Sequence, residues 1–233
     1  MEAPFDIAAD LDTPVSAYMK LKAFEPCFLL ESVESGERLA RYSFVGLGAS
    51  LTLELYPDRI VVDGRDEARP EGPGAWQQMM RGMLDRCPEL KPAMAEIPFN
   101  GGLVGATGYD VVRFFERLPD KTSPRPTEPQ AAYVAPKSLL VFDHLTRRVA
   151  LLHSGSEAQR QALRRDVIRA LRGGIDAPNG GSHTQPVPGF DKADFLQAVD
   201  RAKDHIRAGD IYQIVLSVGF SGTCDVDAFQ VYR

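Results

Sequence analysis

The sequence predicts an α+β fold built mainly from an antiparallel β-sheet sandwich with helices on its outside. Three observations support this class. Leucines at 51, 53 and 55 alternate with Thr52 and Glu54, which is the period of a half-buried strand. Residues 60–62 form an apolar return strand, and Asp63-Gly64 after it is a strong hairpin signal. Residues 157–172 place their apolar side chains on one face of a helix that ends at Gly173.

The other elements of the first three quarters of the chain follow from similar local signals. Asp12-Thr13-Pro14 indicates a helix start, because a polar cap precedes a proline in the first turn. A run of prolines indicates that residues 118–136 are mainly loop. Further strands are expected at 28–30, 41–46, 138–142 and 148–152, with a helix at 76–86.

A change in composition divides the chain. Residues 173–189 mix Gly, Pro, Asn and Ser without periodicity, which predicts a linker between a region at 1–172 and a second region at 190–233. In the second region Asp191 caps a helix that Gly209 ends, and residues 211–218 are a strand candidate. A further helix begins near Asp225 and stops at the last residue, so we expect the chain to be a truncated part of a longer protein.

Composition excludes several classes of function. The net charge of -5 argues against nucleic acid or an anionic membrane as the main partner. No apolar stretch approaches the roughly 20 residues of a membrane span, and the first residues do not resemble a secretory signal. The 3 cysteines are widely spaced, which suggests neither a disulfide framework nor a zinc site. A cytoplasmic protein is expected.

Taken alone, the residues do not identify a reaction. The sequence contains no Walker-type phosphate loop, and the glycines at 101–108 lack the spacing of a dinucleotide loop. We expect those glycines to let strands pack closely. The histidines at 144, 153, 183 and 205 are scattered, and solvated or capping roles are expected for them. This evidence extends only to an α+β domain that could hold a ligand.

Three segments, in this order, resemble anthranilate synthase component I, the large subunit of that enzyme. The first is LLESVESGE at 29–37 followed by RYSFVG at 41–46, with DTPVSAY at 12–18 before it. The second is GGLVG at 101–105 followed by GYDVVR at 108–113 and ERLP at 116–119. The third is AGDIYQIVLS at 208–217, which is similar to the opening of the family's chorismate-binding region. The resemblance runs from Asp10 to Arg233 and implies a truncated fold of the same type.

The resemblance implies a feedback site for L-tryptophan, lined by Leu30, Glu31 and Ser32. A serine hydroxyl and a carboxylate can receive an ammonium group, while leucine side chains contact an indole ring. Alternatively, Glu31 and Ser32 are only the polar end of a core strand.

The resemblance also implies a reaction, the conversion of chorismate and ammonia to anthranilate and pyruvate with Mg²⁺. Relatives that add water to chorismate carry a basic lysine where this chain has Gln213, a possible neighbour of the active site. Glutamine cannot act as a base at neutral pH, so it fits amination; a structural role in a strand is the alternative. The metal ligands and the acid–base residue belong to the family's C-terminal part, so this chain alone is predicted to be inactive and to contain no catalytic or metal-binding residue.

The implied partners are chorismate, L-tryptophan and a glutamine amidotransferase small subunit (component II), in an oligomer. Two alternatives stay open. One is aminodeoxychorismate synthase component I of folate synthesis, whose distinguishing segment would lie beyond Arg233. The other is a non-catalytic module that binds tryptophan or a partner.

Overall fold

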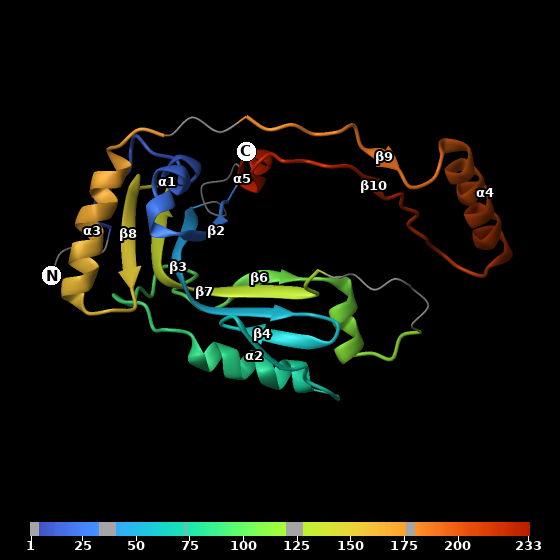
Figure 1. Ribbon diagram of the computed structural model, residues 1–233, viewed down its shortest axis with the longest axis horizontal. Coiled ribbons are helices and arrows are strands. Elements are labelled where there is room, and N and C mark those ends of the chain that lie inside the picture. Colours follow the sequence, from blue (N-terminus) through green and yellow to red (C-terminus); the bar gives the residue numbers. More distant parts are fainter. Residues whose placement is uncertain (1–4, 33–40, 73, 120–127, 176–179) are drawn as a thin grey trace. The chain divides into compact units, whose positions relative to one another are not determined.

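The computed structural model describes residues 5–32, 41–72, 74–119, 128–175 and 180–233. It divides into two compact units, Met1–Asp176 and Ala177–Arg233, which are treated separately below (Figure 1). The boundaries predicted from composition, 1–172, 173–189 and 190–233, stay a prediction.

Unit 1 is a mixed structure of strands and helices, and the predicted α+β class is confirmed. Its strands are β1 (Ile7–Ala8), β2 (Pro26–Leu30), β3 (Tyr42–Leu55), β4 (Arg59–Val62), β5 (Arg65–Ala68), β6 (Val104–Thr107), β7 (Ala131–Asp143) and β8 (Arg148–His153). Its α-helices are α1 (Pro14–Lys20), α2 (Ala75–Arg86) and α3 (Glu157–Leu171), and its 3₁₀ helices are η1 (Lys22–Phe24) and η2 (Tyr109–Phe114).

The strands form one curled antiparallel sheet. β3 and β7 pair along their whole lengths, from Tyr42 opposite Asp143 to Leu55 opposite Ala131. One end of this ribbon carries β2, β8 and β1, and the other end carries β4, β5 and β6. The register shifts between Ala49 and Leu51, beside Gly48 at φ +63°, and the sheet bends in the middle of the ribbon (Figure 1). The two layers predicted as a sandwich therefore belong to a single sheet.

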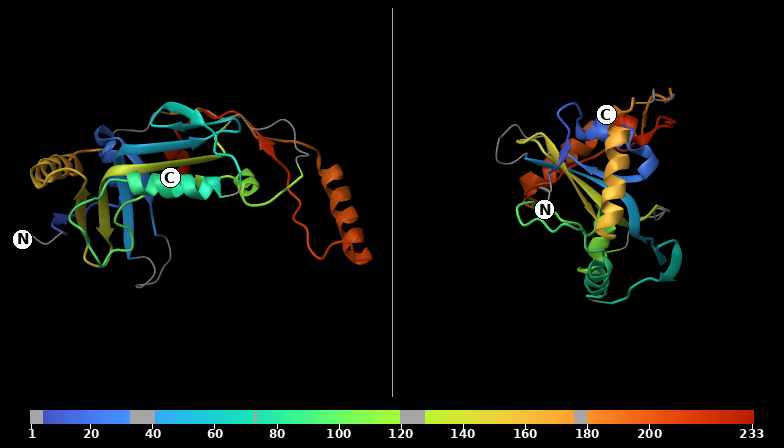
Figure 2. Two further views of the ribbon diagram at one scale, coloured as in Figure 1. Left: turned by 90° about the horizontal axis from the view of Figure 1, so that it is seen from below. Right: turned by 90° about the vertical axis from the view of Figure 1, so that its left-hand side faces the viewer.

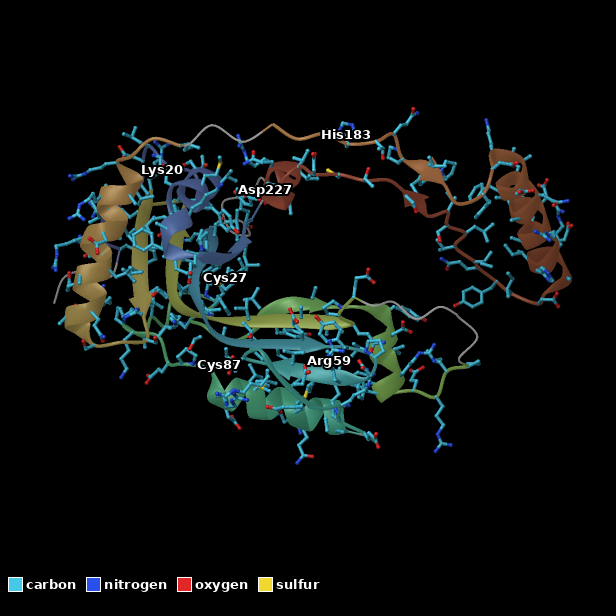
Figure 3. The ribbon with its side chains drawn as sticks, viewed as in Figure 1. Lys20, Cys27, Arg59, Cys87, His183 and Asp227 are labelled. Atoms are coloured by element: carbon cyan, nitrogen blue, oxygen red, sulfur yellow. The ribbon has the colours of Figure 1, made fainter. Side chains whose placement is uncertain are left out.

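Three apolar clusters stabilise this sheet. At the β8 end, α1 and α3 cover one face, with Leu21, Val45 and Val167 at its centre. The segment 90–99 covers the opposite face of the same end. At the β4 end, α2 and η2 cover one face and bury Trp76, and the left view of Figure 2 shows α2 running along the sheet. Lys20 (Figure 3) ties α1 to the end of α3, since its Nζ donates to the Leu171 carbonyl at 2.7 Å.

The predicted helices are confirmed. Thr13 and Ser156 cap α1 and α3, and each makes a reciprocal capping box with the residue three positions later. The Asp63-Gly64 turn joins β4 to β5 as predicted, with positive φ at both residues. The structural role predicted for the glycine-rich segment is confirmed at Gly105, where a Cβ would lie 2.0 Å from the Ala132 carbonyl oxygen.

Two predictions about secondary structure were wrong. The loop predicted at 118–136 does not extend to its last residues, because β7 already begins at Ala131 and pairs with both β3 and β6. Residues 120–127 of that prediction lie outside the described residues. Residues 211–218 do not form a strand. In the described part of unit 2 they have no neighbouring strand to satisfy their backbone groups, and only the two-residue strands β9 (Val187–Pro188) and β10 (Phe220–Ser221) pair.

Unit 2 has almost no core of its own. Its helices are α4 (Lys192–Ala208), capped by Asp191 and ended by Gly209, and α5 (Ala228–Tyr232). Of the residues described in this unit, Ala202 alone is buried, whereas Tyr212 and Val215 are largely exposed. Within the described ranges, no helix has the length and apolar character needed to cross a bilayer.

Candidate functional site

Three strand ends meet where the sequence predicted a ligand site. β2 ends at Leu30, which lies opposite Phe44 of β3, and β3 begins at Tyr42, which lies opposite Asp143 at the end of β7. We call residues 30–32 the Leu30–Ser32 corner. Because β2 and β7 flank the first residues of β3, side chains from all three strands converge beside this corner.

Hydrogen bonds through a buried serine hold the corner. The backbone N–H of Ser32 donates to Ser43 Oγ at 3.3 Å, and Ser43 is 0% exposed. Ser43 Oγ is in turn 2.8 Å from His144 Nε2. The His144 backbone N–H donates to the Arg41 carbonyl at 2.9 Å, which fixes the imidazole-bearing residue against the start of β3.

A bidentate ion pair lies beside these hydrogen bonds. Arg41 donates from Nε to Asp143 Oδ1 at 3.0 Å and from Nη2 to Oδ2 at 2.8 Å. Burial by itself would raise the pKa of Asp143, but the bonds from Arg41, the Leu145 N–H and the Thr146 side chain outweigh it and hold that pKa below its ordinary value. The carboxylate is therefore kept ionised, with a guanidinium beside it that is partly open to solvent.

On the side away from this ion pair, the corner is apolar. Leu30 is 40% exposed, so it presents an accessible hydrocarbon surface at the strand end. Two residues earlier, the Phe28 ring packs over Gly46 and meets Phe99 edge-on at 6.3 Å. Cys27, labelled in Figure 3, precedes it on β2, and burial raises the pKa of its thiol to about 11. The thiol is thus protonated at neutral pH and has low reactivity as a nucleophile.

The structure places the predicted site residues in different units. Leu30, Glu31 and Ser32 follow one another at the end of β2 in unit 1, and both polar residues are half-buried. Gln213 lies in unit 2, in an exposed irregular segment. The proposed binding role of the first three and the catalytic neighbourhood of Gln213 stay predictions.

Sequence reasoning missed Asp143 and His144 as neighbours of this corner. His144 is 101 positions from its partner Ser43, so no local spacing reveals the pair. The apolar run 138–142 before them was a usable signal, because polar residues directly after a central strand gather at the sheet's edge.

The Mg²⁺ ligands were predicted to lie in the family's C-terminal part, and this stays a prediction. Among the described residues, no three His, Cys, Asp or Glu side chains come together in a way that could hold a metal ion.

The corner thus has the Arg41–Asp143 ion pair on one side and the exposed apolar side chain of Leu30 on the other. Comparison with known proteins gives the chain a family. The sequence profile of chorismate binding enzymes matches residues 25–233. The chain belongs to the chorismate binding enzyme family. Among curated relatives, it is 38% identical to anthranilate synthase component 1 of Thermus thermophilus over 97% of the chain, and 30% identical to the protein of that name from Acetivibrio thermocellus over 98%.

A solved structure supports the fold. The crystal structure of anthranilate synthase component I from Streptococcus pneumoniae matches all of this chain with a TM-score of 0.60 at 22% identity. The chain covers 52% of that protein, and 48% and 49% of the two curated relatives. It thus spans about half the length of the proteins it matches, and the predicted resemblance to this subunit is confirmed.

Proposed function

We propose that this chain is the amino-terminal part of an anthranilate synthase large subunit, a lyase that works in the cytoplasm in tryptophan biosynthesis. The whole protein would convert chorismate and ammonia to anthranilate and pyruvate, with ammonia supplied from glutamine by an amidotransferase partner. The observation that carries the proposal is the 38% identity to anthranilate synthase component 1 across 97% of this chain.

The Leu30–Ser32 corner is the proposed site of feedback inhibition by L-tryptophan. The Glu31 carboxylate and Ser32 hydroxyl supply acceptors for the ammonium group, and the exposed Leu30 side chain supplies apolar contact for the indole. Arg41, whose guanidinium is partly exposed beside this corner, offers a positive charge of the kind that a carboxylate requires.

This chain's part in the chemistry is to bind and position rather than to move protons. Gln213, as an amide, can donate and accept hydrogen bonds near chorismate but cannot remove a proton at neutral pH. Mg²⁺ in the whole enzyme would stabilise the substrate carboxylate and the departing hydroxyl. Its ligands, like the acid–base residue, are proposed to lie in the other half of the protein, so this chain by itself is expected to be inactive.

The test compares this chain with the protein from the full reading frame, each incubated with chorismate, Mg²⁺ and an ammonium salt. We expect anthranilate fluorescence from the full protein only, and inhibition of that signal by L-tryptophan. Turnover by the 233-residue chain alone would refute the assignment of the catalytic groups to the other half.

Product analysis separates the alternatives. Aminodeoxychorismate without pyruvate release would identify the folate-pathway enzyme instead. Tryptophan binding by a full protein that forms neither product would identify a regulatory module. Co-purification with a glutamine amidotransferase subunit, and the mass of the resulting complex, test the proposed partner and oligomer.

A further inference from the structure

Beside the proposed tryptophan site, one hydrogen-bond chain links a solvent-exposed imidazole to the backbone of the corner. It runs from His144 through the buried hydroxyl of Ser43 to the N–H of Ser32. His144 itself is exposed. It lies outside the corner and is the residue that directly follows β7. The imidazole is thus separated from Ser32 by one side chain.

The donors and acceptors of the His144–Ser43–Ser32 hydrogen bonds have one consistent arrangement. A serine hydroxyl has one hydrogen and can accept two hydrogen bonds. Ser43 Oγ accepts from the Ser32 N–H, and Ser43 is 0% exposed, so its own hydrogen needs an acceptor within the protein. His144 Nε2, at 2.8 Å, is placed to accept it, and this assigns the ring proton to Nδ1.

We propose that His144 is a positioning residue for L-tryptophan: by orienting the Ser43 hydroxyl, it fixes the Ser32 backbone and so sets the affinity of the Leu30–Ser32 corner. This inference rests on the proposed function of that corner. The rotation of the hydroxyl is the sensitive step. Without an acceptor at Nε2, the hydroxyl hydrogen turns to another partner and the lone pair that receives the Ser32 N–H turns with it.

The same sheet contains a matched pair that serves as a control. Ser138 Oγ lies 2.8 Å from His153 Nδ1, and Ser138 is also buried, at 3% exposure. Both serines lie on the central β3–β7 ribbon, and both histidines stand at a strand end or directly after one. Ser138 pairs with Leu47 and His153 across the sheet, well along the strands from residues 30–32. If the effect were only a general loss of sheet stability, disrupting either serine–histidine pair should therefore produce it.

The experiment uses His144→Phe, which keeps a planar ring without the acceptor, and His144→Gln, which restores a polar atom at similar reach. His153→Phe and His153→Gln are the controls. In the full-length enzyme, the L-tryptophan concentration that halves activity is measured against each variant's own uninhibited rate. In this chain, the hydrogen-exchange rate of the Ser32 amide is measured by NMR.

His144→Phe should raise the half-inhibiting tryptophan concentration about fivefold and speed exchange of the Ser32 amide by a similar factor, the effect of one typical hydrogen bond. His144→Gln should return both values to within about twofold of the wild type, again by the size of a hydrogen bond. Equal effects of His144→Phe and His153→Phe, or failure of His144→Gln to restore either value, would overturn the positioning role.

The two readouts also separate the inference from the function on which it rests. A wild-type enzyme insensitive to L-tryptophan would refute the feedback site, whatever the exchange rates are. A sensitive enzyme whose Ser32 amide and inhibition are unchanged in His144→Phe would refute the role of His144 alone.

Discussion

The packing of Phe28 over Gly46 makes a quantitative prediction about the strand pair that carries the Leu30–Ser32 corner. A Cβ on Gly46 would lie 2.3, 2.5 and 2.7 Å from three ring carbons of Phe28, and these are its three nearest neighbours. Gly46→Ala must therefore push the ring out of its place. In doing so it breaks the edge-on contact of Phe28 with Phe99.

The magnitudes predict strong non-additivity. Overpacking of this kind costs about 2 kcal/mol, and removing a part-buried ring by Phe28→Ala costs about 3 kcal/mol. Independent effects would give about 5 kcal/mol in the double variant. However, the added methyl group occupies space that the ring has vacated. We therefore expect a loss of about 3 kcal/mol for the double variant, which corresponds to a coupling of about 2 kcal/mol.

Urea unfolding of the wild type, both single variants and the double variant measures this coupling. Far-UV circular dichroism follows the sheet, and the fluorescence of Trp76, the chain's 1 tryptophan, follows the core under α2. The slope of free energy against urea should stay constant across the four proteins. Effects that add to within about 0.5 kcal/mol would show that Phe28 does not pack on Gly46 as described.

Four further predictions concern acid stability, thiol reactivity and association. Since Asp143 has a lowered pKa, its contribution to stability is present at neutral pH and is lost as pH falls through that lowered value. Arg41→Ala should therefore move the midpoint of acid unfolding to higher pH, and an unchanged midpoint would contradict this. Burial, followed by the charge of a nearby arginine, lowers the pKa of His153, so thermal stability should decline as pH falls below about 6.5, and His153→Gln should flatten that decline between pH 7.5 and 5. The exposed Cys224 should react with a thiol reagent well before the half-buried Cys27, and equal rates would refute the burial argument. The exposed apolar side chains of unit 2 should make this chain bind ANS and self-associate, whereas a dye-silent monomer in light scattering would count against that expectation.

Local patterns predicted the elements whose determinants lie within a few residues of one another. The alternation at 51–55 correctly placed Leu51, Leu53 and Leu55 on the buried face of β3. Capping signals likewise gave the starts of α1 and α4, at Thr13 and Asp191. The same method failed at 131–136, because Pro136 and the prolines before it hid the first half of β7. A proline is tolerated there because Pro136 lies beside the register shift, opposite Ala49, where the ladder is already interrupted.

The features that could not be predicted from the sequence depend on contacts between residues far apart in the chain. Residues 211–218 are apolar enough for a strand, but a strand needs a neighbour, and the described part of unit 2 supplies none to them. The convergence of Ser43 with His144, and of Arg41 with Asp143, depends on the pairing of β3 with β7. The motif at 29–32 pointed to the corner, whereas the histidine that contacts Ser43 beside it follows a strand about 100 positions later.

The long β3–β7 ribbon also dictates an order of events during synthesis. β3 is complete at Leu55, yet its partner begins only at Ala131, so residues 56–130 must emerge from the ribosome before the central ladder can start. At about 5–20 residues per second, β3 waits for several seconds with the backbone groups of its β7-facing edge unpaired. Early on, the hairpin with β4 and the pairing with β2 are its only native neighbours among the described strands. Those two short pairings cover part of β3 and so limit premature association of the nascent chain. Closure of the sheet over such a sequence separation is the step expected to limit its folding rate.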